Sequence, residues 1–250
     1  MKFTTSLHVT FNIGAVSMCE VYGFCGSVPT KLNKYTDEFW THGRVHRDGF
    51  GYYLIDKDDF YVNPDSAANH LDKLFNKSFT SKLALCHIRF KTHGPATENN
   101  CHPFVKKDLH DVKWSLIHNG YIDDSLVVEA IGSLQNGSTD SERILLAIIE
   151  TVNAFYEHSW IENRDEWLSH LYKELGITLT GLSTLGKTNL IFTDSLTNNM
   201  YVYMNHPFTL FSLTTDTGVH ISTTKLSNEN WEPVKPYVLH IYNNGRLINN

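Results

Sequence analysis

The chain has 250 residues, of which 41% are hydrophobic and 19% are charged, and its formal net charge is -6 at pH 7. This composition is typical of a globular protein that can bury a hydrophobic core, as one large domain or two small ones. An acidic balance without a run of Lys and Arg argues against nucleic acid or an anionic membrane as partner. No apolar stretch is long enough to span a bilayer.

The predicted elements are strands, then helices, then strands again. Expected strands lie at 18–26, 50–55, 60–62, 82–90, 112–117, 189–193, 200–203, 209–213, 219–222 and 237–241, and expected helices at 32–40, 66–75, 125–131, 165–175 and after 138. The triplet His118-Asn119-Gly120 indicates a turn. This order of elements predicts antiparallel sheets covered by helices, rather than alternating strands and helices, in a single domain.

The cysteines and the first residues bear on where the protein resides. The chain has four cysteines: Cys19, Cys25, Cys86 and Cys101. They show no closely spaced disulfide pattern. The first residues do not fit a secretion signal, because polar residues interrupt the first apolar run and Met18 occupies the position before a cleavage site, where a small residue is required. We expect reduced thiols in a cytoplasmic protein, and we interpret residues 1–18 as a leader that is removed or not translated.

Taken singly, the polar motifs have ordinary structural explanations. Cys19 could be a buried structural thiol, and Arg89 could form a surface ion pair. Thr139 fits the N-cap of a helix, with Glu142 reaching back as in a capping box. That arrangement leaves Asp140 in the first turn, where the helix dipole favours a carboxylate.

Two catalytic or metal-binding interpretations fit poorly. The pairs Cys86-His87 and Cys101-His102 lack the short spaced loops of structural zinc sites, and adjacent residues of a strand point to opposite faces. A papain-like Cys-His-Asn set is disfavoured because the neighbours His118 and Asn119 cannot easily act as base and orienting residue in one line. We therefore expect neither a metal nor another cofactor.

The motifs are better explained as a set. In chain order they are Met18-Cys19-Glu20-Val21-Tyr22-Gly23-Phe24, Asp48-Gly49-Phe50-Gly51, His87-Ile88-Arg89, Lys91-Thr92-His93-Gly94, Asn100-Cys101-His102-Pro103-Phe104, Trp114 with His118-Asn119-Gly120, and Thr139-Asp140-Ser141-Glu142. Their order and content resemble the class II glutamine amidotransferases, which belong to the N-terminal nucleophile hydrolases. The resemblance implies a four-layer αββα sandwich of two antiparallel sheets, with residues 19–250 as one domain. The chain is similar to the stand-alone members of this family, some of which act on γ-glutamyl compounds.

The resemblance implies a catalytic role for three residues. Cys19, carrying a free α-amino group once Met18 is absent, would attack the γ-carbonyl of a glutamine-like substrate and form a thioester. The α-amino group has a pKa of about 7.7–8.0 and is suited to accept the thiol proton near neutrality. The Asn119 side-chain amide and the Gly120 backbone N–H would form the oxyanion hole.

The resemblance also implies how the substrate is bound. Arg89 would hold the α-carboxylate, because its planar guanidinium suits bidentate bonding. Asp140 would hold the α-ammonium group, and Thr92 and His93 would line that end of the site. Binding both charges of a small zwitterion fixes its position relative to the thiol.

The sequence leaves two other functions open. One is a non-catalytic binding or regulatory protein on the same fold, whose leader stays in place. The other is a subunit that supplies ammonia to a separate synthase. The expected substrate is glutamine or a γ-glutamyl compound, with water as the default acyl acceptor.

Overall fold

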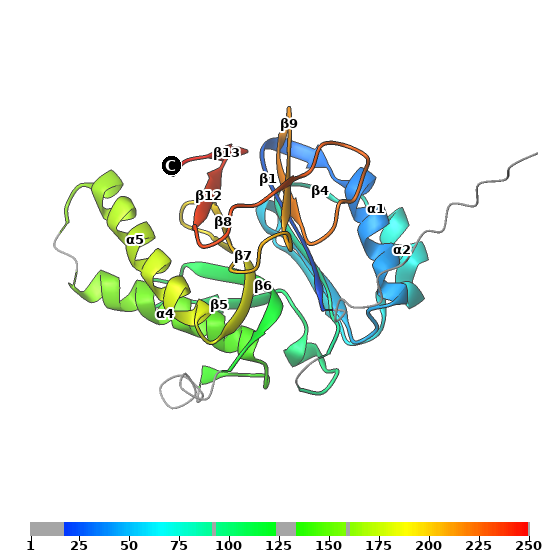
Figure 1. The fold of residues 1–250 in the computed structure, drawn as a ribbon, viewed down its shortest axis with the longest axis horizontal. Coiled ribbons are helices and arrows are strands. Elements are labelled where there is room, and N and C mark those ends of the chain that lie inside the picture. Colours follow the sequence, from blue (N-terminus) through cyan, green and yellow to red (C-terminus); the bar gives the residue numbers. More distant parts are fainter. Residues whose placement is uncertain (1–17, 92–93, 124–133, 159–160, 250) are drawn as a thin grey trace, which may run out of the picture.

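The structure, a computed structural model, describes residues 18–91, 94–123, 134–158 and 161–249. Two antiparallel sheets lie face to face (Figure 1). The seven-stranded sheet has the order β11 (Glu232–Pro233), β9 (Phe211–Thr215), β10 (Gly218–Ser222), β1 (Glu20–Lys31), β4 (Thr80–Ile88), β2 (Phe50–Leu54) and β3 (Asp59–Asn63). The six-stranded sheet has the order β13 (Arg246–Leu247), β12 (His240–Asn243), β8 (Met200–Tyr203), β7 (Gly186–Asp194), β6 (Lys113–Ile122) and β5 (Phe104–Lys107).

Helices cover the outer face of each sheet. The helices α1 (Asn33–Thr41) and α2 (Leu71–Asn76) lie on the seven-stranded sheet, and α4 (Asp140–His158) and α5 (Arg164–Ser183) lie on the six-stranded sheet (Figure 1). Three buried apolar clusters correspond to this layering: one beneath each helical layer and one between the sheets. The predicted four-layer αββα fold is confirmed.

Strand β1 shows how the sequence specifies two of these layers. Side chains alternate between the two faces of a strand. Val21 and Cys25 pack between the sheets, whereas Tyr22 and Phe24 pack against the helical layer. Because β1 pairs with β10 on one side and β4 on the other, both of its faces are covered and its backbone is bonded along both edges.

One local prediction is wrong at a place that matters for the site. His118-Asn119-Gly120 is not a turn but part of β6, which continues to Ile122. Strand β7 supplies the reason, because it pairs with β6 along its length and sets Asn119 opposite Asn189. Turn-forming residues therefore stay extended where a long partner strand satisfies their backbone groups.

Other boundaries differ less. The predicted helix at 66–75 begins as a short 3-10 helix at Ala67, with Ser66 as its N-cap, and continues as α2. The predicted strand at 237–241 starts only at His240. The short strands β5, β11 and β13 were not predicted, and the expected helix at 125–131 lies outside the described residues.

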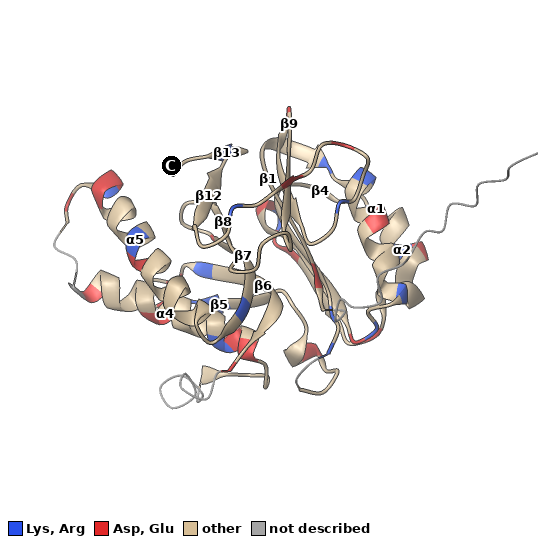
Figure 2. Ribbon diagram, in the orientation of Figure 1, with Lys and Arg blue, Asp and Glu red and all other residues tan. Residues whose placement is uncertain are grey.

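The surface charge and the hydropathy of the helices add two observations. Lys and Arg are distributed over both halves of the molecule rather than gathered in one stripe (Figure 2). None of the helices in the described ranges combines the length and apolar character that crossing a bilayer requires.

Candidate active site

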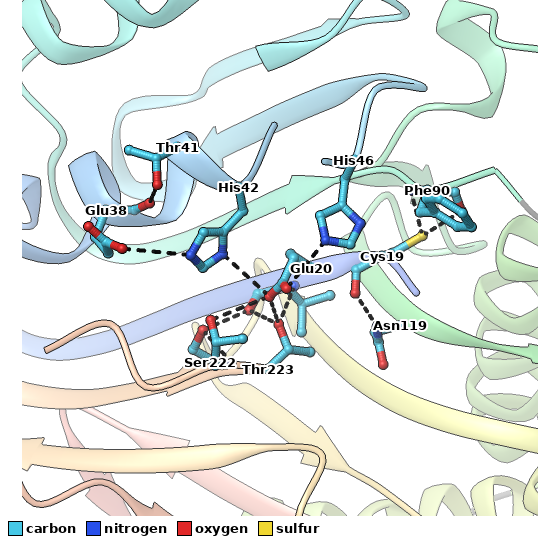
Figure 3. A network of polar contacts seen from close by, with 12 residues as sticks. Cys19, Glu20, Glu38, Thr41, His42, His46, Phe90, Asn119, Ser222 and Thr223 are labelled. Carbon is cyan, nitrogen blue, oxygen red and sulfur yellow. Dashed lines mark hydrogen bonds and ion pairs between the residues drawn. The ribbon is translucent and has the colours of Figure 1, made fainter. Parts of the chain in front are cut away.

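Cys19 lies immediately before β1, where the chain enters the centre of the seven-stranded sheet. Its thiol is held at the end of the neighbouring strand β4 (Figure 3). Sγ lies 3.3 Å from the carbonyl oxygen of Phe90, to which it donates, and 3.4 Å from the backbone nitrogen of the same residue, from which it accepts. Two main-chain contacts thus fix the position of the sulfur.

The environment of Cys19 keeps its thiol protonated. Burial raises the pKa of Cys19 to about 11; the nearby Arg89 lowers this pKa and Asp140 raises it. A thiol with this pKa is a weak nucleophile at pH 7, so chemistry at this position needs a base.

Asn119 faces Cys19 from the opposite sheet. Its Nδ2 donates a hydrogen bond to the backbone carbonyl oxygen of Cys19 (Figure 3). Its Oδ1 accepts a hydrogen bond of 2.8 Å from Nδ2 of Asn189, which lies opposite it on β7. The amide of Asn119 is therefore oriented with its donor nitrogen toward Cys19.

Gly120 follows Asn119 where β6 and β7 come close together. A Cβ atom at this position would lie 1.9 Å from the carbonyl oxygen of Lys187 and 2.4 Å from Nε2 of His118. Only glycine fits between these atoms without a shift of the strands, because real Cβ contacts are far longer.

Arg89 and Asp140, two of the residues expected to bind the α-end of a substrate, are both buried. Arg89 is buried and donates to the main-chain oxygens of Pro95, at 3.0 Å, and Gly94, at 3.4 Å. Asp140 is buried in the first turn of α4, where its Oδ2 accepts a hydrogen bond of 3.0 Å from the backbone nitrogen of Ile122. Thr92 and His93 lie outside the described residues.

The start of α4 is capped largely as expected. The hydroxyl oxygen of Thr139 accepts a hydrogen bond of 3.3 Å from the backbone nitrogen of Glu142. The carboxylate of Glu142 reaches back beyond Thr139, where it accepts from the backbone nitrogens of Asn136, at 2.8 Å, and Gly137, at 2.7 Å. The carboxylate also forms an ion pair of 2.9 Å with Nζ of Lys106, so the charge of Glu142 stabilises the loop before the helix.

Sequence reasoning missed a polar cluster around Glu20, which lies next to Cys19 (Figure 3). The carboxylate lies 3.6 Å from Nε2 of His46 and 3.8 Å from Nδ1 of His42, and it accepts a hydrogen bond from the hydroxyl of Thr223. The hydrogen bond to Glu20 raises the pKa of His42, whereas burial lowers that of His46. No sequence signal joins these residues, because the fold brings them together from three separate segments.

A cavity of about 320 Å³ opens beside the thiol. Its walls include Cys19, Glu20, His46, Asn119, Lys187 and Thr209. Burial lowers the pKa of Lys187, and its Nζ lies 3.2 Å from the sulfur of Met18. Sequence reasoning missed Lys187 as well.

The remaining cysteines behave as core residues. All four thiols are free, and Cys25, Cys86 and Cys101 are buried. Within the described ranges, no three His, Cys, Asp or Glu side chains are grouped so that they could hold a metal ion.

Comparison with known proteins identifies the family to which the chain is similar. The family model described as class-II glutamine amidotransferases matches residues 18–250. An uncharacterized protein of Methanocaldococcus jannaschii is 23% identical over 92% of this chain and 71% of its own length.

Two solved structures share the fold. The glutamine phosphoribosylpyrophosphate amidotransferase of B. subtilis aligns with a TM-score of 0.64 at 17% identity, over 92% of this chain. The chain spans about half of that structure, 48% of its length. A predicted glutamine amidotransferase of Pseudomonas aeruginosa aligns with a TM-score of 0.63 at 18% identity, over 93% of this chain and 100% of the other. At these identities the likeness establishes the fold.

Proposed function

Because the chain belongs to the class-II glutamine amidotransferases, we propose that it cleaves the γ-amide of glutamine or of a γ-glutamyl compound through a thioester on Cys19. One observation carries the proposal. The Nδ2 donor of Asn119 reaches Cys19 across the gap between the two sheets, beside an open cavity. A nucleophile, an amide donor and room for a substrate thus meet at one place.

The first step requires a base close to the thiol. Burial gives Cys19 a pKa of about 11, so the thiol does not ionise unaided at neutral pH. We include in the proposal that residues 1–18 are removed or not translated, which leaves the α-amino group of Cys19 free. With a pKa of about 7.7–8.0, this amine accepts the thiol proton and later donates it to the leaving nitrogen.

The oxyanion of the tetrahedral intermediate needs donors that are already in place. The side chain of Asn119 supplies one, and the backbone N–H of Gly120 is the proposed second. The hydrogen bond from Asn189 fixes the orientation of the Asn119 amide, so little reorganisation is required as charge develops.

The charged end of the substrate is assigned to Arg89 and Asp140, with Thr92 and His93 beside them. Support for the assignment comes from the burial of Arg89 and Asp140 and from their effect on the pKa of Cys19. A buried cation and a buried anion that both influence the thiol match the α-carboxylate and α-ammonium groups of a γ-glutamyl substrate.

The test begins with the mass of the purified protein and continues with activity. A chain that starts at Cys19 should release glutamate from glutamine or a γ-glutamyl amide, and Cys19→Ala should abolish this release. Cys25→Ala, within β1, should retain it and serves as the control. Full activity of the Cys19→Ala variant, or of a chain in which Met18 is still joined to Cys19, would rule out the mechanism.

A second arrangement, in which the released ammonia passes to a separate synthase, has one observation in its favour. The amidotransferase structure from B. subtilis is about twice as long as the part matched here. Co-purification of a second protein that takes up ammonia from this chain would support this arrangement. Stoichiometric release of free ammonia in its presence would contradict it.

A further inference from the structure

Lys187 has a fixed place in the wall of the cavity. It lies on β7 opposite Tyr121 of β6, and its backbone oxygen accepts a hydrogen bond of 3.0 Å from Nε2 of His118. Its side chain lines the same cavity as Cys19 and Asn119. The ammonium group therefore belongs to the surroundings of the thiol, although the catalytic steps described above do not use it.

The charge of Lys187 is poorly paired. The residue is half-buried, and within the described part of the chain its Nζ forms no ion pair, only a hydrogen bond to the thioether of Met18. A thioether is a weak acceptor. Cys19 and Glu20 favour the charged form of Lys187 without forming an ion pair with it, and the carboxylate of Glu20 already contacts His42, His46 and Thr223. A half-buried cation with so weak a partner is suited to bind an anion.

The cavity is separate from the residues assigned to the α-end of the substrate. Arg89 and Asp140, proposed to hold the α-end of the substrate, do not line it, whereas Asn119 does. With the α-end of a γ-glutamyl chain assigned to Arg89 and Asp140, the cavity lined by Lys187 is left for the leaving group. The absence of Met18 in the processed chain removes the only hydrogen-bond partner of Nζ in the described structure.

The size of the cavity argues against ammonia as its main occupant. Its volume of about 320 Å³ is roughly ten times the ~30 Å³ that one water molecule occupies in the liquid. Departing ammonia needs no more space than a water molecule. An amino acid released from a γ-glutamyl amide would fill much more of it.

We propose that Lys187 binds a carboxylate on the leaving group, so that the substrate class of this site is γ-glutamyl amino acids or peptides rather than glutamine. The inference rests on the proposed function. Cys19 forms a thioester with the γ-carbonyl carbon as the C–N bond breaks, and the amino acid leaves after taking the proton held by the α-amino group of Cys19. Water then hydrolyses the thioester, releasing glutamate and restoring the thiol.

The test compares three substrates on the processed chain: γ-glutamylglycine, γ-glutamylglycinamide and glutamine. The first two differ only in the carboxylate. We expect kcat/KM for γ-glutamylglycine to exceed that for the glycinamide about tenfold to a hundredfold, as for a hydrogen bond between charged groups. Lys187→Met should reduce this ratio to about one while leaving glutamine hydrolysis within about threefold, and Lys187→Arg should retain most of it.

Lys173→Met, on α5 and away from this cavity, is the matched control and should behave as the unchanged chain. Equal hydrolysis of the two glycine derivatives would overturn the inference and leave the proposed function intact. An equal loss for all three substrates in Lys187→Met would also overturn it, because Lys187 would then act on the reaction rather than on the leaving group. No hydrolysis of any substrate by the processed chain would overturn both proposals.

Discussion

Asn189 orients Asn119 through a hydrogen bond of 2.8 Å, from Nδ2 of Asn189 to Oδ1 of Asn119. The oxygen of Asn189 in turn accepts a hydrogen bond of 3.1 Å from the hydroxyl of Thr209. This chain of contacts sets which end of the Asn119 amide points at Cys19. The orientation of a donor is thus determined by residues that need not touch the substrate.

We expect Asn119→Ala to lower kcat by about a hundredfold to a thousandfold, the usual cost of removing an oxyanion donor. Asn189→Ala should lower kcat by about tenfold to a hundredfold with KM little changed, because it misplaces the donor without removing it. Steady-state kinetics on the processed chain provides the measurement. A rise in KM alone in Asn189→Ala would show that Asn189 does not position the donor.

Gly120 should not tolerate a side chain. Gly120→Ala places a methyl group against the carbonyl oxygen of Lys187, and we expect a loss of about 3 kcal/mol in the free energy of unfolding together with loss of activity. Gly176→Ala in α5 is the matched control, because no described atom outside its own stretch of helix lies within 4 Å of the added Cβ. It should stabilise the protein by about 0.5–1 kcal/mol. Urea denaturation of both variants tests the pair, and equal stability would refute the expectation.

The reactivity of Cys19 should depend on whether Met18 is attached. In the joined form burial disfavours the thiolate and raises the pKa to about 11, so about one thiol in a thousand is ionised at pH 8. Alkylation of Cys19 by iodoacetamide should therefore rise about tenfold per pH unit from pH 8 to 10. In the processed chain the nearby α-ammonium group favours the thiolate, so labelling at pH 8 should be faster. Mass spectrometry of the Cys19 peptide gives the rates, and a pH-independent rate in the joined form would contradict this account.

Asp140→Asn should weaken substrate binding without unfolding the protein. The variant keeps an oxygen that can accept from the backbone nitrogen of Ile122, but it loses the negative charge proposed to hold the α-ammonium group. We expect KM to rise by the equivalent of about 1.5–3 kcal/mol with a smaller change in kcat. Asp165→Asn, in the first turn of α5, is the control. An unchanged KM would remove Asp140 from the site.

Glu142 should be important for stability. Its buried carboxylate serves two backbone nitrogens and Lys106, so Glu142→Ala should cost about 3 kcal/mol in the free energy of unfolding. Lys106→Met leaves the two backbone hydrogen bonds intact but removes the countercharge of the buried carboxylate, and should cost about 1.5 kcal/mol. Chemical denaturation measures both values, and a cost for Glu142→Ala no greater than for Lys106→Met would show that the backbone contacts contribute little.

The layers of the fold could be predicted from the sequence because they depend on hydrophobic patterns that are the same before and after the elements pack together. The alternation of side chains in β1 and the apolar face of α4 each determine a local structure that the fold then buries. The prediction of a turn at His118-Asn119-Gly120 was wrong because turn propensity is a local property. The strand that keeps these residues extended, β7, is about seventy residues away in the chain.

Some residues of the candidate site could be predicted from the sequence and others could not. Cys19 and Asn119, named from sequence motifs, do lie together. Glu20 and Lys187 could not be found from the sequence, because a lone Glu on a strand and a lone Lys on another have many ordinary explanations. Both residues line the cavity beside Cys19. That cavity forms only when β1, β7 and the segments around Thr209 and Thr223 come together in the fold.

The position of β1 has a last consequence for a chain that starts at Cys19. Chain termini usually fray, because their first residues have few partners. Here the first residue would enter directly a strand of 12 residues that is bonded to β10 and β4 on its two sides. The new amino end would be as well ordered as the middle of the sheet. A terminal amine can then serve as a base of defined position, which a frayed end could not.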